Sequence, residues 1–205
     1  MFATTFEKPF RHWLIENAFP ESLIAAALVE WPDPAWPHWH RYDSAESRKL
    51  ATRDPHRLPE ACRIIYNRLC CLDVGSLLGV SSVFPDFSGY GAGLHWIPQG
   101  GHLSVHRDAA RHPTMGWQRR LSVCLYLDDQ HDGGSLDLFE SDGKTRAVQI
   151  APKANRLVIF ECGDDSYHGV PDMVTAPNGR KSIAAFFWSE GSTPVAERTQ
   201  AEFVS

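Results

Sequence analysis

A short stretch with three histidines and an aspartate, HLSVHRDAARH at residues 102–112, has the composition of a metal site. His106 and Asp108 lie two residues apart, so their side chains point to the same face of an extended strand. His102 and His106 would also share a face, but about 13 Å apart at the usual rise, which is too far to bind one ion. His112 follows in a polar loop. The spacing therefore favours His106 and Asp108 as metal ligands.

A third candidate ligand, His168, lies far downstream in YHGV at residues 167–170. Two imidazoles and one carboxylate on one face of Fe(II) form a facial triad, which leaves adjacent positions open for a co-substrate and oxygen. An H-x-D pair alone is weak evidence, and a lone turn histidine more often bonds the backbone. The triad is a hypothesis that needs support from the rest of the chain.

That support comes from Arg180 and Ser182, which would share one face at the start of the strand-like segment KSIAAFFWSE. An arginine inside an apolar sandwich needs an anionic partner, because an unpaired buried charge is costly. A guanidinium group holds a carboxylate through two hydrogen bonds, and a nearby hydroxyl adds another. The alternative is an exposed Arg-Lys pair after the tight turn at residues 177–179, with Lys181 as the competing cation.

The bulk composition limits the class of protein. A chain of 205 residues with 43% hydrophobic and 22% charged residues is typical of one soluble domain. The net charge of −5 argues against a nucleic-acid partner. No apolar run approaches the roughly 20 residues that span a membrane, and the first residues do not resemble a signal peptide. Five cysteines without a C-x-x-C motif predict reduced thiols in a cytoplasmic protein.

The order of predicted elements indicates an α+β, mainly β fold. Helices are expected at about residues 21–30 and 59–78, with a short strand at 13–15. Short β-type runs separated by Gly, Pro, Asp and Asn follow from residue 90 onward. Residues 33–57 have little periodicity and are expected to form a lid or binding loop, or a surface loop with one strand at 39–43.

These elements predict a double-stranded β-helix, that is, a cupin-like jelly roll, with N-terminal helices packed on one sheet. We expect a single domain over residues 1–205. Its parts are a helical N-terminal layer (1–90), a jelly-roll catalytic core (91–190) and a C-terminal tail (191–205).

From about residue 91 to residue 188 the chain resembles the 2-oxoglutarate- and Fe(II)-dependent dioxygenases, in their prolyl-4-hydroxylase-like branch. The matching motifs occur in the family's order: HRD (106–108), CLYL (124–127), DGGSLDLF (132–139), APKANRLVIF (151–160), YHGV (167–170) and RKSIAAFFW (180–188). This resemblance implies that the chain is an enzyme that uses Fe(II), 2-oxoglutarate and O2, with ascorbate as a candidate stimulant.

The resemblance also implies the role of each residue. The iron ligands would be His106, Asp108 and His168; the contacts to 2-oxoglutarate would be Arg180, Ser182, Tyr126 and Trp96, the last where relatives often carry a tyrosine. Related halogenases replace the aspartate by a small residue, so Asp108 favours hydroxylation. The implied reaction couples oxidative decarboxylation of 2-oxoglutarate, to succinate and CO2, to hydroxylation of an unactivated C–H bond.

The substrate is less constrained, and a prolyl residue, an amino acid and a small biosynthetic intermediate are all open. We expect the substrate wall to include Trp39, Arg41, Arg111, His112, Trp117 and Arg119, a mixture that suits a polar or anionic molecule. Three alternatives remain for the same jelly roll. They are a zinc-dependent hydrolase, a non-catalytic cupin-like binding module and a structural jelly roll with incidental histidines.

Overall fold

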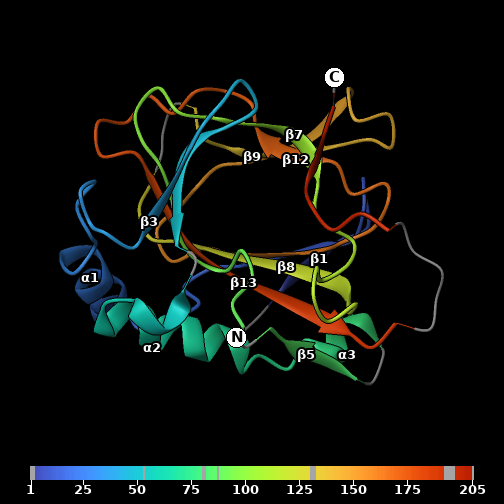
Figure 1. Cartoon of the computed structure of the whole chain (residues 1–205), viewed down its shortest axis with the longest axis horizontal. Helices are drawn as coiled ribbons and strands as arrows, with labels where there is room; N and C mark the ends of the chain where they lie inside the picture. The colour runs from blue at the N-terminus through green and yellow to red at the C-terminus, as the bar shows by residue number, and fades with distance from the viewer. Residues whose placement is uncertain are drawn as a thin grey trace.

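Two antiparallel sheets face each other, and helices cover the outer side of one of them (Figure 1). The computed structural model describes residues 3–52, 54–79, 82–86, 88–129, 133–191 and 197–204. Asp132 of the DGGSLDLF motif lies outside these residues. The mainly β architecture predicted from the sequence is confirmed.

The major sheet has the strand order β1-β2-β11-β8-β13-β6-β4-β3, with β5 pairing to β13 as well. Its central strands, β8 and β13, are long and make the most extensive pairing of the fold. The strands are β1 (Thr4–Phe6), β2 (His12–Ile15), β3 (Trp39–Asp43), β4 (Arg48–Thr52), β5 (Val83–Pro85), β6 (Gly93–Ile97), β8 (Gln118–Tyr126), β11 (Leu157–Glu161) and β13 (Arg180–Ser189).

The minor sheet has the order β10-β9-β12-β7-β14 and lies across from the centre of the major sheet (Figure 1). Its strands are β7 (Leu103–Arg107), β9 (Leu136–Phe139), β10 (Arg146–Ile150), β12 (His168–Val170) and β14 (Glu202–Phe203). The metal-binding candidates come from β7 and β12, which are neighbours in this sheet.

The helices are α1 (Glu21–Val29), α2 (Glu60–Cys70), the short α3 (Gly75–Leu78) and a 3-10 turn at Pro55–Arg57. Helices α1 and α2 bury apolar side chains in the cluster on the outer side of the major sheet. Ile65 and Leu69 of α2 are fully buried in one cluster with Val123 and Leu125 of β8. Because side chains alternate along a strand, the intervening β8 residue Cys124 points instead into the space between the sheets.

Three expectations about the organisation need correction. Residues 1–90 are not simply a helical layer, because β1 to β5 join the major sheet. Within residues 33–57 the expected strand at 39–43 is confirmed as β3. A second strand, β4, pairs with it and with β6, so the segment forms a hairpin and not a lid. The tail is not separate from the core, since β14 pairs with β7. β1, β4 and β14 have little apolar alternation, so pairing with a neighbouring strand stabilises them more than their own pattern does.

Two further expectations concern the state of the thiols and the presence of a membrane-spanning helix. All five cysteines are free thiols. Within the described residues, no helix is long and apolar enough to cross a membrane. The cytoplasmic location stays a prediction.

A buried asparagine fastens the helical layer to the sheets. Asn155 adopts a left-handed backbone with φ of 63° and is 4% exposed. Its side chain accepts a hydrogen bond from Phe19 N at 2.9 Å and donates one to Phe19 O at 2.7 Å. The backbone N–H and C=O of Phe19 are thus both hydrogen-bonded by one side chain that is distant in sequence.

Replacing Asn155 by alanine is expected to lower the free energy of unfolding by about 2–4 kcal/mol, because two buried polar groups lose their partners. Urea unfolding measures this loss. Asn17→Ala is the matched control, since Asn17 is also left-handed, with φ of 51°, but exposed. That variant should lose about 1 kcal/mol from the backbone conformation alone. Equal losses in the two variants would contradict the importance of the buried bonds.

Candidate metal centre

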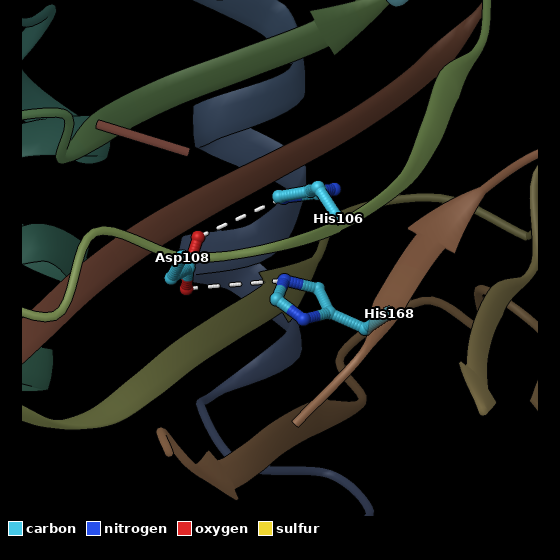
Figure 2. A group of neighbouring side chains, drawn as sticks. All are labelled: His106, Asp108 and His168. Carbon is cyan, nitrogen blue, oxygen red and sulfur yellow. Dashed lines mark ion pairs between the residues drawn. The ribbon is translucent and has the colours of Figure 1, made fainter. Parts of the chain in front are cut away.

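The three candidate ligands meet between the sheets. His106 of β7 and His168 of β12 are directly opposite each other in the antiparallel ladder, and their ring centroids lie 4.4 Å apart. Asp108 follows the end of β7 and points its carboxylate at both rings (Figure 2). One ligand atom from each residue lies within 4.8 Å of the others. A Cβ at Gly169 would lie 2.9 Å from Leu103 O, so the glycine of YHGV allows this close strand approach.

Both imidazoles present the same nitrogen to the centre. His106 Nδ1 lies 2.9 Å from Ser104 O, and His168 Nδ1 lies 2.9 Å from Ser166 O. A carbonyl oxygen only accepts, so each Nδ1 carries the proton and each Nε2 keeps its lone pair for a metal. Burial, followed by the neighbouring His106, lowers the pKa of His168 to about 4, so this ring is neutral at physiological pH.

Asp108 is held by Ser122 and Arg119, while its Oδ2 also lies 3.8 Å from His168 Nε2. Its Oδ2 accepts a hydrogen bond from Ser122 Oγ at 2.7 Å and an ion pair from Arg119 at 3.3 Å. Its Oδ1 lies 3.7 Å from His106 Nε2. Burial would raise the pKa of Asp108, but the charge of Arg119, followed by the neighbouring imidazole of His168, holds it well below its usual range. The carboxylate is therefore ionised, and Oδ1 is the oxygen best placed for a metal.

Arg119 is expected to set the affinity for Fe(II) by orienting Asp108. Arg119→Met keeps an apolar stem against Phe186 and Trp188, over whose rings the guanidinium lies, but removes the ion pair. Loss of such an outer partner should weaken Fe(II) binding about 10–100-fold in an anaerobic titration. The neighbouring Arg120→Met is the control, because Arg120 contacts Ser189 and not the centre. Equal Fe(II) affinity in the two variants would contradict this role.

A second group of predicted residues lies at the start of β13. Arg180 is 5% exposed and donates a hydrogen bond to Tyr126 Oη at 2.9 Å. Ser182 shares its face and lies opposite Tyr126 in the ladder. Arg180 has no carboxylate within ion-pair distance among the residues that the structure describes, and its Nε has no hydrogen-bond partner there. A buried guanidinium in this state is suited to a bound carboxylate.

The donor set fits Fe(II). Two imidazoles and one ionised carboxylate, all on one side, make the 2-His-1-carboxylate arrangement of non-haem iron oxygenases. The same ligands could bind zinc, but a zinc site alone does not explain why the buried Arg180 has no anion at ion-pair distance among the described residues.

The comparison with protein families agrees with this geometry. Residues 92–188 match the family described as the 2OG-Fe(II) oxygenase superfamily. The chain belongs to the 2OG-Fe(II) oxygenase superfamily. This family and the triad together imply Fe(II) and 2-oxoglutarate as cofactor and co-substrate.

Similar proteins place the oxygenase near the prolyl hydroxylases. Prolyl 3-hydroxylase 2 of Mus musculus is 34% identical over 86 residues, which are 42% of this chain and 12% of that protein. A prolyl-4-hydroxylase of Pseudomonas putida has a similar solved structure, with a TM-score of 0.63, 21% identity, and coverage of 88% of this chain and 93% of that one.

Enzymes with other names share the fold. The carbocyclase SnoK from nogalamycin biosynthesis has a TM-score of 0.66 at 12% identity and covers 92% of this chain and 83% of its own. The oxygenase matches only a small part of the curated prolyl hydroxylase's length, and these structural likenesses concern the fold alone.

One expected 2-oxoglutarate contact is not brought to the site. Trp96 pairs with Lys181, whose neighbours Arg180 and Ser182 face the interior, so Trp96 faces the outer side. There its indole donates to Asn178 O at 3.0 Å. The position on β6 that faces the interior is His95, opposite Ser182. The sequence-based assignment thus missed the strand register by one residue.

The expected substrate residues Trp39 and Arg41 also lie on the outer side. Trp39 packs on Trp96, with ring centroids 6.2 Å apart, and its indole donates to Asp33 O. Arg41 is exposed and reaches Pro34 O at 3.4 Å. These residues stabilise the outer surface of the hairpin and do not line the interior.

The expected substrate residues after β7 have structural partners. His112 is 4% exposed, lies 3.4 Å from Asp86 and accepts backbone hydrogen bonds at Nδ1. Trp117 packs against its ring at 5.4 Å, and Arg111 pairs with Glu197 at 3.3 Å. Arg119 lies on Asp108, as described above. The structure therefore brings only Arg119, of the expected substrate residues, to the metal centre.

Two features of the interior were missed from the sequence. Ser122 is a small polar residue in the apolar part of β8, and it alternates with Val123 on the same strand. That pattern could have indicated that Ser122 faces the interior. Lys49 of β4 shares the inner face, because it pairs with Tyr42 and lies two residues from Ala51, opposite His95. The hairpin register that directs it there depends on strand pairing, which local sequence does not reveal.

Proposed function

We propose that the protein couples oxidative decarboxylation of 2-oxoglutarate, to succinate and CO2, to hydroxylation of an unactivated C–H bond. In this proposal His106, Asp108 and His168 bind Fe(II), which supplies the oxygen-dependent redox chemistry. Arg180 holds the distal carboxylate of 2-oxoglutarate, with Ser182 assisting. The protein's own contribution is to bind, orient and keep water from the reacting groups.

The observation that carries the proposal is that the metal triad and the buried Arg180 both lie in the space between the two sheets. The buried guanidinium of Arg180 donates a hydrogen bond to Tyr126 Oη, but it has no anion at ion-pair distance among the described residues. 2-Oxoglutarate supplies a carboxylate for it and a second carboxylate with a keto oxygen for the metal. A zinc hydrolase leaves Arg180 unexplained, and a binding module without catalysis would be expected to lack a ligand or this arginine.

A proline ring is the first substrate to test. Curated proteins similar to part of this chain include prolyl 3-hydroxylases, among them the mouse protein at 34% identity over 86 residues. The ionised Asp108 occupies the position that a halide would need, which supports hydroxylation over halogenation. Free amino acids and small biosynthetic intermediates remain the second group of candidates.

The function is tested by substrate-stimulated succinate formation. The purified chain with Fe(II), 2-oxoglutarate and O2 is screened against proline-containing peptides, free amino acids and small metabolites. We expect succinate formation to rise with the true substrate, and a product heavier by one oxygen to form in equal amount. Substrate turnover that needs Zn(II) and not 2-oxoglutarate would overturn the proposal in favour of a hydrolase.

A further inference from the structure

The β3–β4 hairpin closes one side of the space between the two sheets (Figure 1). On one flank β4 pairs with β6 of the major sheet. Beside its turn, Arg48 N donates to His102 O at 3.0 Å, and Ser104 N donates to Glu46 O at 2.8 Å, both at the start of β7. The wall that carries Lys49 therefore joins the metal-bearing strand to the sheet that carries Arg180.

The register directs Lys49 into this space. Ala51 lies opposite His95, and His95 lies opposite Ser182 on the inner face. Lys49 is two residues from Ala51 on the same strand, so it shares that face. Two residues further along these strands, Lys49 of β4 and Arg180 of β13 lie in line on either side of β6. Their backbones are therefore two strand spacings apart, which is about 10 Å.

The ammonium group of Lys49 has no counterion there. Its Nζ lies 5.3 Å from the centre of the Tyr42 ring, and it makes no hydrogen bond or ion pair within the described part of the chain. The nearby carboxylate of Asp108 is already paired with Arg119 at 3.3 Å. Burial lowers the pKa of Lys49 to about 8, while Asp108 raises it and Arg180 lowers it further. The amine is thus largely protonated at neutral pH.

The other charges of the interior are accounted for by the proposed function. One carboxylate of 2-oxoglutarate goes to the metal and the other to Arg180. Burial lowers the pKa of the neighbouring His95 to about 3, so this ring is neutral, and its Nε2 donates to Gly91 O at 2.8 Å. Among the residues that the structure describes, Lys49 remains as an interior cation without an anion at ion-pair distance.

We propose that Lys49 binds a carboxylate of the primary substrate, which is therefore a small carboxylic acid, such as a free amino acid, and not an internal peptide residue. This inference rests on the proposed function and deepens it. A charge-assisted hydrogen bond from an ammonium group gives both affinity and orientation of the substrate C–H bond toward the metal.

Matched acid and amide probes test this recognition. Succinate formation is measured with L-proline and L-prolinamide, with other free amino acids and their amides, and with peptides carrying glutamate next to proline. We expect the free acids to have an apparent KM about 10–100-fold lower than their amides. Equal stimulation by acid and amide, or the absence of any preferred acid in the panel, overturns the proposal. Preference for the glutamate peptides over the free acids overturns the small-molecule assignment.

Variants then assign the effect to Lys49. Lys49→Met should raise the apparent KM for the preferred acid about 10–100-fold and leave that for the amide unchanged. Lys49→Arg should restore part of the preference, and Arg48→Met, an exposed neighbour, should have no effect. Anaerobic 2-oxoglutarate binding should change less than about 2-fold in Lys49→Met. A large loss of 2-oxoglutarate affinity would instead make Lys49 a co-substrate residue and overturn the proposal.

The two proposals fail in different ways. If acids are preferred in succinate formation but no hydroxylated product appears, hydroxylation is wrong and the role of Lys49 stands. If hydroxylated product forms equally from acids and amides, hydroxylation stands and the role of Lys49 is wrong.

Discussion

Arg180→Met is expected to raise the KM for 2-oxoglutarate by about 30-fold or more. Removing one partner of a buried, hydrogen-bonded charge pair costs roughly 2–5 kcal/mol, and each 1.4 kcal/mol is about tenfold in affinity. Arg180 is 5% exposed, so water cannot replace the guanidinium at this position. Initial rates of succinate formation at varied 2-oxoglutarate concentration measure the effect.

Lys181→Met is the matched control. Lys181 is the adjacent cation, but it faces the opposite side and pairs with Asp128 at 3.4 Å. Its replacement should leave the KM for 2-oxoglutarate within about 2-fold of the wild-type value, since it lies away from the interior. If Lys181→Met raises the KM and Arg180→Met does not, the assignment of the co-substrate carboxylate is wrong.

Asp108→Ala is expected to abolish coupled turnover and to weaken Fe(II) binding by more than about 100-fold. Loss of an outer partner of a metal ligand already costs 10–100-fold, and the ligand itself contributes more. The variant also leaves Arg119 buried without its carboxylate at 3.3 Å. Anaerobic Fe(II) titration and succinate assays measure the two losses.

A nearby carboxylate separates this effect from a general loss of negative charge. Asp165 is exposed, and Asp165→Ala removes one charge from the same region without touching the centre. This variant should bind Fe(II) and form succinate as the wild type does. Retained Fe(II) affinity in Asp108→Ala would show that the metal is held elsewhere.

His106 and Asp108 were predictable because their spacing is a local signal. The two-residue spacing of His106 and Asp108 places both side chains on one side of the chain wherever the strand lies. His168 required the order of motifs along the chain as well, and the structure places it directly opposite His106. Arg180 and Ser182 followed from the same alternation at the start of a strongly apolar strand.

The errors came from pairings that no local pattern specifies. Trp96 and His95 are adjacent in sequence, and only the register of β6 against β13 decides which faces the interior. Residues 39–52 have little apolar alternation, yet they form a hairpin because β6 offers an edge for pairing. That hairpin turns Trp39 outward and Lys49 inward. A one-residue change of register reverses such an assignment, so substrate residues were the least predictable part of the site.

The most direct test of the oxygenase assignment is an anaerobic titration of the wild-type chain with Fe(II) and then with 2-oxoglutarate. We expect a weak visible charge-transfer band that saturates with one 2-oxoglutarate per iron. The band should be absent in Asp108→Ala, and Arg180→Met should need about 30-fold or more 2-oxoglutarate to reach it. The absence of a band in the wild type, together with activity supported by Zn(II) alone, would show that the protein is not a 2-oxoglutarate-dependent oxygenase.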